Sequence, residues 1–69
     1  MIGSRIRKIR NLHNLSQQGL SNLTLISKGR LGRIEREEVS ITFNELSIIA
    51  RSLNVSIYDI INPKPQTTP

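Results

Sequence analysis

Apolar residues recur three or four positions apart along most of this chain, which is the spacing of one buried face of an α-helix. The longest stripe consists of Leu46, Ile49, Ala50 and Leu53. Just before it, Thr42 and Glu45 have the spacing of a capping box, in which each side chain bonds the backbone N–H of the other residue. The pattern therefore predicts a well-formed helix that begins at Thr42.

Four shorter stripes predict four further helices, each opened by a serine that can accept a hydrogen bond from the first turn. The caps are Ser4, Ser16, Ser27 and Ser56. The inward residues of the first three are Ile6 and Ile9, then Leu20 and Leu23, then Leu31 and Ile34, and the apolar content of the last helix is Ile57, Ile60 and Ile61. Phe43 is expected to pack in the core or against a cap. No segment alternates long enough for a strand, so we expect an all-α fold, a compact five-helix bundle.

The chain of 69 residues is the size of one small domain. All three prolines lie in the last seven residues, which also lack apolar side chains that could be buried. We therefore expect a folded domain over residues 1–61 and a disordered Pro/Thr tail over residues 62–69.

Composition excludes several classes of function. The chain has no cysteine and a single His13, so we expect no disulfide, metal site or cofactor. The longest strictly apolar run is Ile48-Ile49-Ala50, too short for a membrane span, and the basic N-terminus lacks the apolar core of a signal peptide. No paired carboxylates or nucleophile with a base are apparent, so we expect no catalytic residue, no small-molecule substrate and no enzyme.

Charge is distributed unevenly. Residues 1–34 hold seven basic residues and no acidic one, whereas residues 35–69 hold three basic and five acidic residues, giving the net charge of +5. Such an asymmetry within one domain indicates a face that binds a polyanion, since a merely solubilising surface mixes both signs.

Residues 15–36, LSQQGLSNLTLISKGRLGRIER, combine a capped short helix, a turn and a second capped helix rich in basic residues. Four motifs carry a wider resemblance: Ile2-Gly3-x-Arg5-Ile6-x-x-x-Arg10, Leu15-Ser16-Gln17-x-x-Leu20, Ile26-Ser27-x-x-x-Leu31-x-x-Ile34-Glu35-Arg36, and Leu46-x-x-Ile49-Ala50-x-x-Leu53-x-Val55-Ser56. In this order and without insertions, residues 2–61 resemble the Cro and lambda-repressor type of helix-turn-helix domain, the XRE family.

The resemblance implies a lambda-repressor-like bundle that binds double-stranded DNA, with the segment from Ser27 to about Arg36 in the major groove. It also implies that Gln17 fixes a phosphate and that Arg10 pairs with Glu35 to support the phosphate-facing side. The expected phosphate contacts are Arg10, Ser16, Gln17, Arg30, Arg36 and Asn44. Arg30 and Arg36 remain alternatives for base contact.

We call the helix expected in the major groove the recognition helix. Leu31 and Ile34 define its buried face, so Gly29, Gly32 and Arg33 lie on the opposite, exposed face. We hypothesise that the two glycines let the helix backbone approach the groove floor, and that Arg33 reads guanine, with Lys28 as a second base contact. The alternative is that Gly29 and Gly32 have drifted without a role.

The chain departs from the family pattern at the turn, where Leu25 stands in place of the usual Gly. A left-handed backbone at a non-glycine residue costs roughly 1–2 kcal/mol. Gly19, Gly29 and Gly32 also lie inside predicted helices, and each costs about 0.5–1 kcal/mol relative to Ala.

We expect a sequence-specific transcriptional regulator, with a repressor of palindromic operators as the favoured form. It would be a cytoplasmic protein, bacterial or phage-encoded, and associated with the nucleoid when bound. Specificity would come from a homodimer formed through Val55, Ile57, Tyr58 and Ile61, unless these residues cap the monomer core. Two alternatives stay open: an antitoxin or adaptor that uses the fold to hold a protein partner, and the DNA-binding part of a larger receptor.

Overall fold

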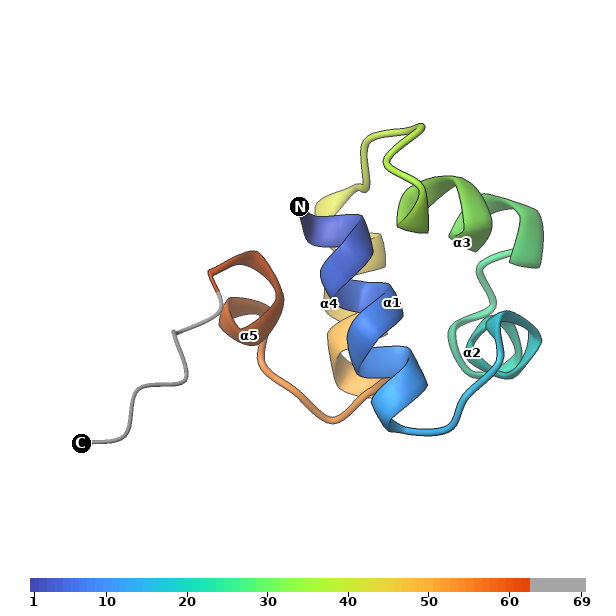
Figure 1. Ribbon diagram of the computed structural model, residues 1–69, viewed down its shortest axis with the longest axis horizontal. Coiled ribbons are helices and arrows are strands. Elements are labelled where there is room, and N and C mark those ends of the chain that lie inside the picture. The colour runs from blue at the N-terminus through green and yellow to red at the C-terminus, as the bar shows by residue number, and fades with distance from the viewer. Residues whose placement is uncertain (63–69) are drawn as a thin grey trace.

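The computed structural model describes residues 1–62 and contains five helices within them. They are α1 (Ile2–Leu12), α2 (Gln17–Thr24), α3 (Lys28–Glu35), α4 (Phe43–Ser52) and α5 (Ile57–Ile61). The helix α1 contacts α3 and α5, while α4 contacts α2 and α5. As a result, α2 and α3 lie together on one side of the molecule and α5 lies on the other (Figure 1). This confirms the all-α five-helix fold. The predicted tail, residues 62–69, lies outside the described residues except for Asn62.

Four of the five predicted helix starts are confirmed with the predicted cap. The side chains of Ser16, Ser27, Thr42 and Ser56 accept hydrogen bonds from the backbone N–H of Gly19, Arg30, Glu45 and Asp59. The capping box at Thr42 is complete, and Ser56 and Asp59 form a second one. These starts are therefore fixed locally, within four residues of sequence.

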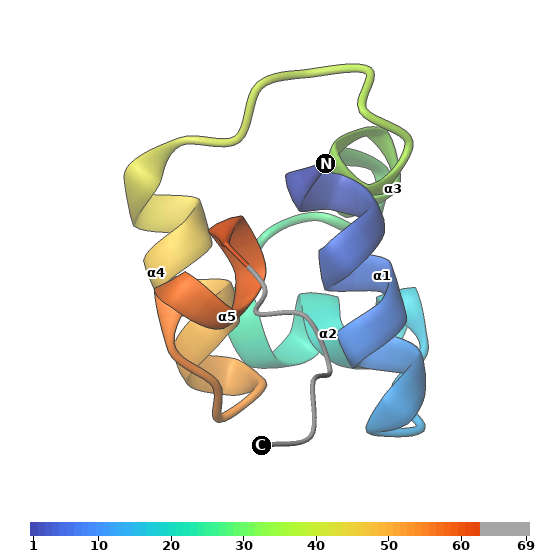
Figure 2. The same cartoon turned by 60° about the vertical axis from the view of Figure 1, so that its left-hand side comes forward.

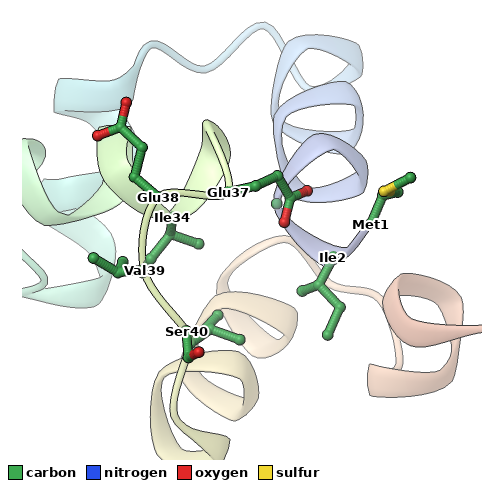
Figure 3. Close-up of a pocket in the computed structure, with 9 residues that line it drawn as sticks. Met1, Ile2, Ile34, Glu37, Glu38, Val39 and Ser40 are labelled. Atoms are coloured by element: carbon green, nitrogen blue, oxygen red, sulfur yellow. The ribbon is translucent and has the colours of Figure 1, made fainter.

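The predicted start at Ser4 is wrong, because α1 begins at Ile2 with Ser4 already inside its first turn. The Ser4 N–H donates to Glu37 Oε2 at 3.0 Å, and the Ser4 hydroxyl donates to the Met1 carbonyl. Figure 3 shows Glu37 beside this first turn. It lies in a pocket that is lined by the segment 37–40 together with Met1 and Ile2. A residue thirty-three positions away thus does the capping, and no local motif signals it.

The core is aliphatic and largely as predicted. Its fully buried members include Ile6, Leu20, Leu31, Ile34, Ile49, Leu53 and Ile60. They come from all five helices, and Figure 2 shows α5 lying across α4 and beside α1, both of which it contacts. The short α5 therefore closes the core through Ile60.

Two apolar residues predicted to be inside are exposed. Leu23 is 57% exposed, because Thr24 lies on the inner face of α2 instead and donates its hydroxyl to the Leu20 carbonyl. Phe43 is 71% exposed, since it is the first residue of α4, one turn before Leu46, the first core residue of that helix.

The turn between α2 and α3 contains the left-handed residue that the family resemblance implied. Leu25 has φ 62° and ψ 15°, and its side chain is 91% exposed. The strained backbone is held by a hydrogen bond from the Leu25 N–H to the Ser21 carbonyl. The Ser21 hydroxyl also donates to the Ile26 carbonyl, so the turn keeps its shape without glycine.

Candidate nucleic-acid interface

The exposed face of α3 presents two cations that no acidic side chain contacts within residues 1–62. Leu31 and Ile34 are buried, which turns Lys28, Gly29 and Arg33 outward. Lys28 and Arg33 make no ion pair in this part of the chain, whereas three other arginines do. A cationic helix face with unpaired Lys and Arg side chains can bind phosphate or base edges.

The two glycines of α3 have different surroundings. A Cβ built at Gly29 would meet nothing within 4 Å, so the backbone there is open. Gly32 is buried, and a Cβ there would lie 3.0 Å from Nη1 of Arg36 and 3.7 Å from Nε2 of Gln17. The expectation that Gly32 is exposed is therefore wrong, because these two side chains cover it.

Arg10 and Glu35 form the predicted pair, and it is buried. Nε and Nη2 of Arg10 donate to the two oxygens of Glu35 at 2.7 and 3.0 Å, with the side chains only 9% and 1% exposed. Nη1 of Arg10 donates to the Leu15 carbonyl, and Nε2 of Gln17 donates to Glu35 at 3.1 Å. This argues against Arg10 as a direct phosphate contact; it positions Gln17 through Glu35.

Arg30 is engaged by α4. Its Nε and Nη2 donate to the carboxylate of Glu45 at 2.8 and 3.0 Å, and Nη2 also donates to the Ser40 carbonyl at 3.2 Å. Glu45 is at the same time the capping-box residue of Thr42. The structure thus argues against Arg30 as a free phosphate clamp. The sequence identified Glu45 as a capping residue but did not indicate that it also pairs with Arg30.

Arg36 pairs with Glu38, and this pair is more exposed than the other two. Nε of Arg36 donates to Oε2 of Glu38 at 2.8 Å, and the side chains are 56% and 52% exposed. The hydrogen bond from Arg36 lowers the pKa of Glu38 below its usual range. Because both groups are open to water, the pair is weak and Arg36 can exchange Glu38 for a phosphate.

Stability should depend on pH through Glu45. Hydrogen bonds from Arg30, aided by Thr42 and opposed by partial burial, hold the pKa of Glu45 at about 2, against 4.5 for an ordinary glutamate. A lowered folded-state pKa stabilises the fold above about pH 4.5, and this contribution is lost as pH falls toward 2. We expect about 1 kcal/mol, because solvent screens a partly exposed pair.

The measurement is urea unfolding of the protein and of Glu45→Gln at several pH values. The difference between them should be largest near pH 7 and should shrink toward pH 2. A difference that stays constant across this range would contradict the assignment.

The remaining predicted phosphate contacts lie at helix N-termini. Ser16 is the exposed N-cap of α2, and Asn44 is exposed in the first turn of α4. Gln17, half-buried, is the first residue of α2. Helix N-termini present free N–H groups and a positive dipole end, which favour an anion.

The predicted dimer residues divide into two pairs. Val55 and Ile57 are half-buried against the monomer core, so part of their apolar surface is already used. Tyr58 and Ile61 are 74% and 45% exposed on α5. Tyr58 and Ile61 are therefore the two predicted dimer residues with enough exposed apolar surface to contact a partner.

The described residues contain no cluster of three or more His, Cys, Asp or Glu side chains placed to hold a metal ion. Over the same residues 1–62, no helix has the length and apolar character needed to span a membrane.

The chain is similar in sequence to known helix-turn-helix proteins. The helix-turn-helix family model HTH_3 matches residues 6–60. The control protein C.SmaI of Serratia marcescens is 33% identical over 57 residues, which cover 83% of this chain and 68% of that protein. No solved structure matches the chain.

Two other relatives are longer. The antitoxin PezA of Streptococcus pneumoniae is 32% identical over 69 residues, and this chain spans 44% of its length. The HTH-type transcriptional regulator SutR of Escherichia coli is 35% identical over 68 residues, and this chain spans 38% of its length. The chain thus spans about two thirds of one relative and less than half of the other two.

Proposed function

This chain belongs to the HTH_3 helix-turn-helix family, the DNA-binding domains of the Cro and lambda-repressor (XRE) type, and we propose that it is a sequence-specific transcriptional regulator. The favoured form is a repressor that acts in the cytoplasm and reads a palindromic operator with α3 in the major groove. The observation that carries this proposal is the exposed face of α3, where Lys28 and Arg33 make no ion pair within residues 1–62 and lie beside the open backbone of Gly29.

In this proposal the residues of the interface have separate roles. Arg33 and Lys28 contact base edges, and Gly29 lets the helix backbone approach them. The phosphate contacts are Ser16, Gln17, Arg36 and Asn44. The buried Arg10–Glu35 pair supports this set because Gln17 is bonded to Glu35. Gly32 makes room for Arg36 to lie across α3 beside Gln17.

The proposed regulator is a homodimer that pairs through Tyr58 and Ile61. One short helix reads few base pairs, and a two-fold dimer doubles the site with half-sites about one helical turn apart. Light scattering at several protein concentrations, with and without DNA, tests the dimer. A strict monomer under all conditions would exclude it.

The function is tested by selecting DNA from a random library at two salt concentrations. We expect a palindromic motif whose enrichment survives the higher salt, because base contacts depend less on counterion release than phosphate contacts do. Sequence-blind binding that disappears with salt would contradict a specific regulator.

Arg33→Ala gives the residue-level prediction. It should reduce discrimination at one position of each half-site by about 1–3 kcal/mol, because a bidentate arginine–guanine contact is lost. The matched control is Arg51→Ala, which removes the same charge from an exposed position on α4. An unchanged ranking of operator variants with Arg33→Ala would reject its role as a base reader.

Gly29→Ala is expected to have opposite effects on folding and binding. Folding should gain about 0.5–1 kcal/mol, because alanine is the better helix former and the Cβ meets nothing within 4 Å. Operator binding should weaken, because that Cβ stands between the backbone and the groove floor. Unfolding and binding are measured on the same preparation. Stronger folding with unchanged binding would show that Gly29 has drifted without a role.

A second candidate is an antitoxin or a protein-binding adaptor. The relative PezA is an antitoxin, and Leu12 and Leu25 are exposed apolar side chains that a partner protein could cover. A third is the DNA-binding part of a longer regulator, since the chain spans only 38% of SutR. Failure of library selection at low salt would favour the adaptor over either regulator.

A further inference from the structure

The recognition helix carries a third cation, Arg30, whose charge is held by another helix. The guanidinium and the Glu45 carboxylate make two parallel hydrogen bonds, Nε to Oε2 at 2.8 Å and Nη2 to Oε1 at 3.0 Å. This bidentate geometry is the strongest arrangement of an arginine with a carboxylate. Of the three cations of α3, Arg30 is therefore the one that forms an ion pair within residues 1–62.

Glu45 is itself fixed in place by the start of α4. Its Oε1 accepts the Thr42 N–H at 2.9 Å, and its own N–H donates to the Thr42 hydroxyl at 3.1 Å. Arg30 Nη2 also donates to the Ser40 carbonyl. The carboxylate thus needs little reorganisation to hold Arg30, which makes the pair more persistent than the exposed Arg36–Glu38 pair.

The pair matters for recognition because of the position of Arg30. It lies between Lys28 and Arg33 in sequence on α3, and its side chain still has 34% of its surface exposed. Without Glu45, a long cation would stand free one helical turn before Arg33, on the opposite shoulder of α3 from Lys28. A free arginine contacts any phosphate, whatever the sequence, and such contacts raise binding to all DNA alike.

We propose that Glu45 is a specificity-determining residue that withholds Arg30 from DNA phosphates, so that Lys28 and Arg33 govern the affinity of α3. The inference rests on the proposed function, since it concerns how this surface discriminates between DNA sequences. It makes Arg30 a positioning residue that joins α3 to α4, in place of a phosphate contact.

The test compares the salt dependence of DNA binding for wild type, Glu45→Gln, Arg30→Gln and the double variant. The probes are a selected operator duplex and a scrambled duplex of the same length. Glutamine preserves the capping box at Thr42, so Glu45→Gln keeps the start of α4 while losing the charge. For Glu45→Gln, the slope of log K against log salt on the scrambled duplex should steepen by about 0.9, the value for one added phosphate contact.

Arg30→Gln alone should leave the slope unchanged, and the double variant should return to the wild-type slope. Specificity, the ratio of operator to scrambled affinity, should fall in Glu45→Gln only. The matched control is Asp59→Asn, which removes the same charge from the capping box of α5, where no ion pair is formed within residues 1–62.

Three outcomes would overturn the inference. One is a slope shallower by about 0.9 in Arg30→Gln, which would mean that Arg30 already contacts a phosphate in the wild type. The second is an unchanged slope in Glu45→Gln, and the third is an equal effect of Asp59→Asn. Arg30→Gln stays decisive if Glu45→Gln does not fold. A wild type that binds neither duplex at low salt would instead refute the proposed function, and the role of Glu45 with it.

Discussion

Replacement of Glu35 by alanine is expected to lower the free energy of unfolding by about 3–5 kcal/mol, because it leaves the buried charge of Arg10 without a partner. The side chains of Arg10 and Glu35 are 9% and 1% exposed, so water cannot compensate the lost carboxylate. A domain of this length has a total stability of roughly 3–10 kcal/mol. Glu35→Ala should therefore be largely unfolded at moderate urea concentrations, as followed by circular dichroism.

The control for this prediction replaces both partners together. Arg10→Met with Glu35→Leu removes both charges while keeping most of the volume, and should recover most of the loss. Glu38→Ala, which breaks an exposed pair, should change stability only slightly. The prediction fails if Glu35→Ala costs no more than Glu38→Ala.

The same pair links folding to the proposed recognition. Gln17 reaches the interface while bonded to Glu35 through Nε2. In the Arg10→Met and Glu35→Leu protein, Gln17 loses this partner although the fold is kept. Weaker operator binding in that stable protein would separate the positioning of Gln17 from the stability of the domain.

Gly3→Ala is expected to destabilise the fold by about 3 kcal/mol, the upper end of the usual cost of overpacking. A Cβ at Gly3 would lie 2.0 Å from the carbonyl oxygen of Ile34 and 3.1 Å from Cα of Glu35. These are backbone atoms of α3, so the clash can be relieved only by moving α1 away from the recognition helix.

Gly29→Ala is the matched control, because it makes the same change within a helix whose surroundings are open. The two variants should shift the urea midpoint in opposite directions, Gly3→Ala downward and Gly29→Ala upward. A Gly3→Ala protein as stable as wild type would show that α1 and α3 are not held as closely as the structure indicates.

Sequence patterns predicted those parts of the fold that depend on near neighbours. The caps at Ser16, Ser27, Thr42 and Ser56 and the stripe from Leu46 to Leu53 are decided within one or two helical turns. The wrong start at Ser4 has a non-local cause, because Glu37 accepts the Ser4 N–H from thirty-three residues away. Phe43 is exposed for a local reason, because it is the first residue of α4, one turn before the first core residue of that helix.

The candidate site divides in the same way. The placement of Lys28 and Arg33 on the outer face of α3 follows from the burial of Leu31 and Ile34, which the helical period predicted. The covering of Gly32 did not follow from that period, because it depends on where Arg36 and Gln17 extend from neighbouring turns and helices.

The sequence by itself determined that the chain is a five-helix domain with an excess of positive charge in its first half, because helix period, caps and charge count are local or additive properties. Only the tertiary structure decided which of those charges remain available. Folding brings Glu35, Glu38 and Glu45 to Arg10, Arg36 and Arg30. Two of these pairs join residues 25 and 15 positions apart in the chain. Ion pairs form between side chains close in space, so folding decides that Arg30 is paired and that, within residues 1–62, Lys28 and Arg33 are the cations of α3 without an ion pair.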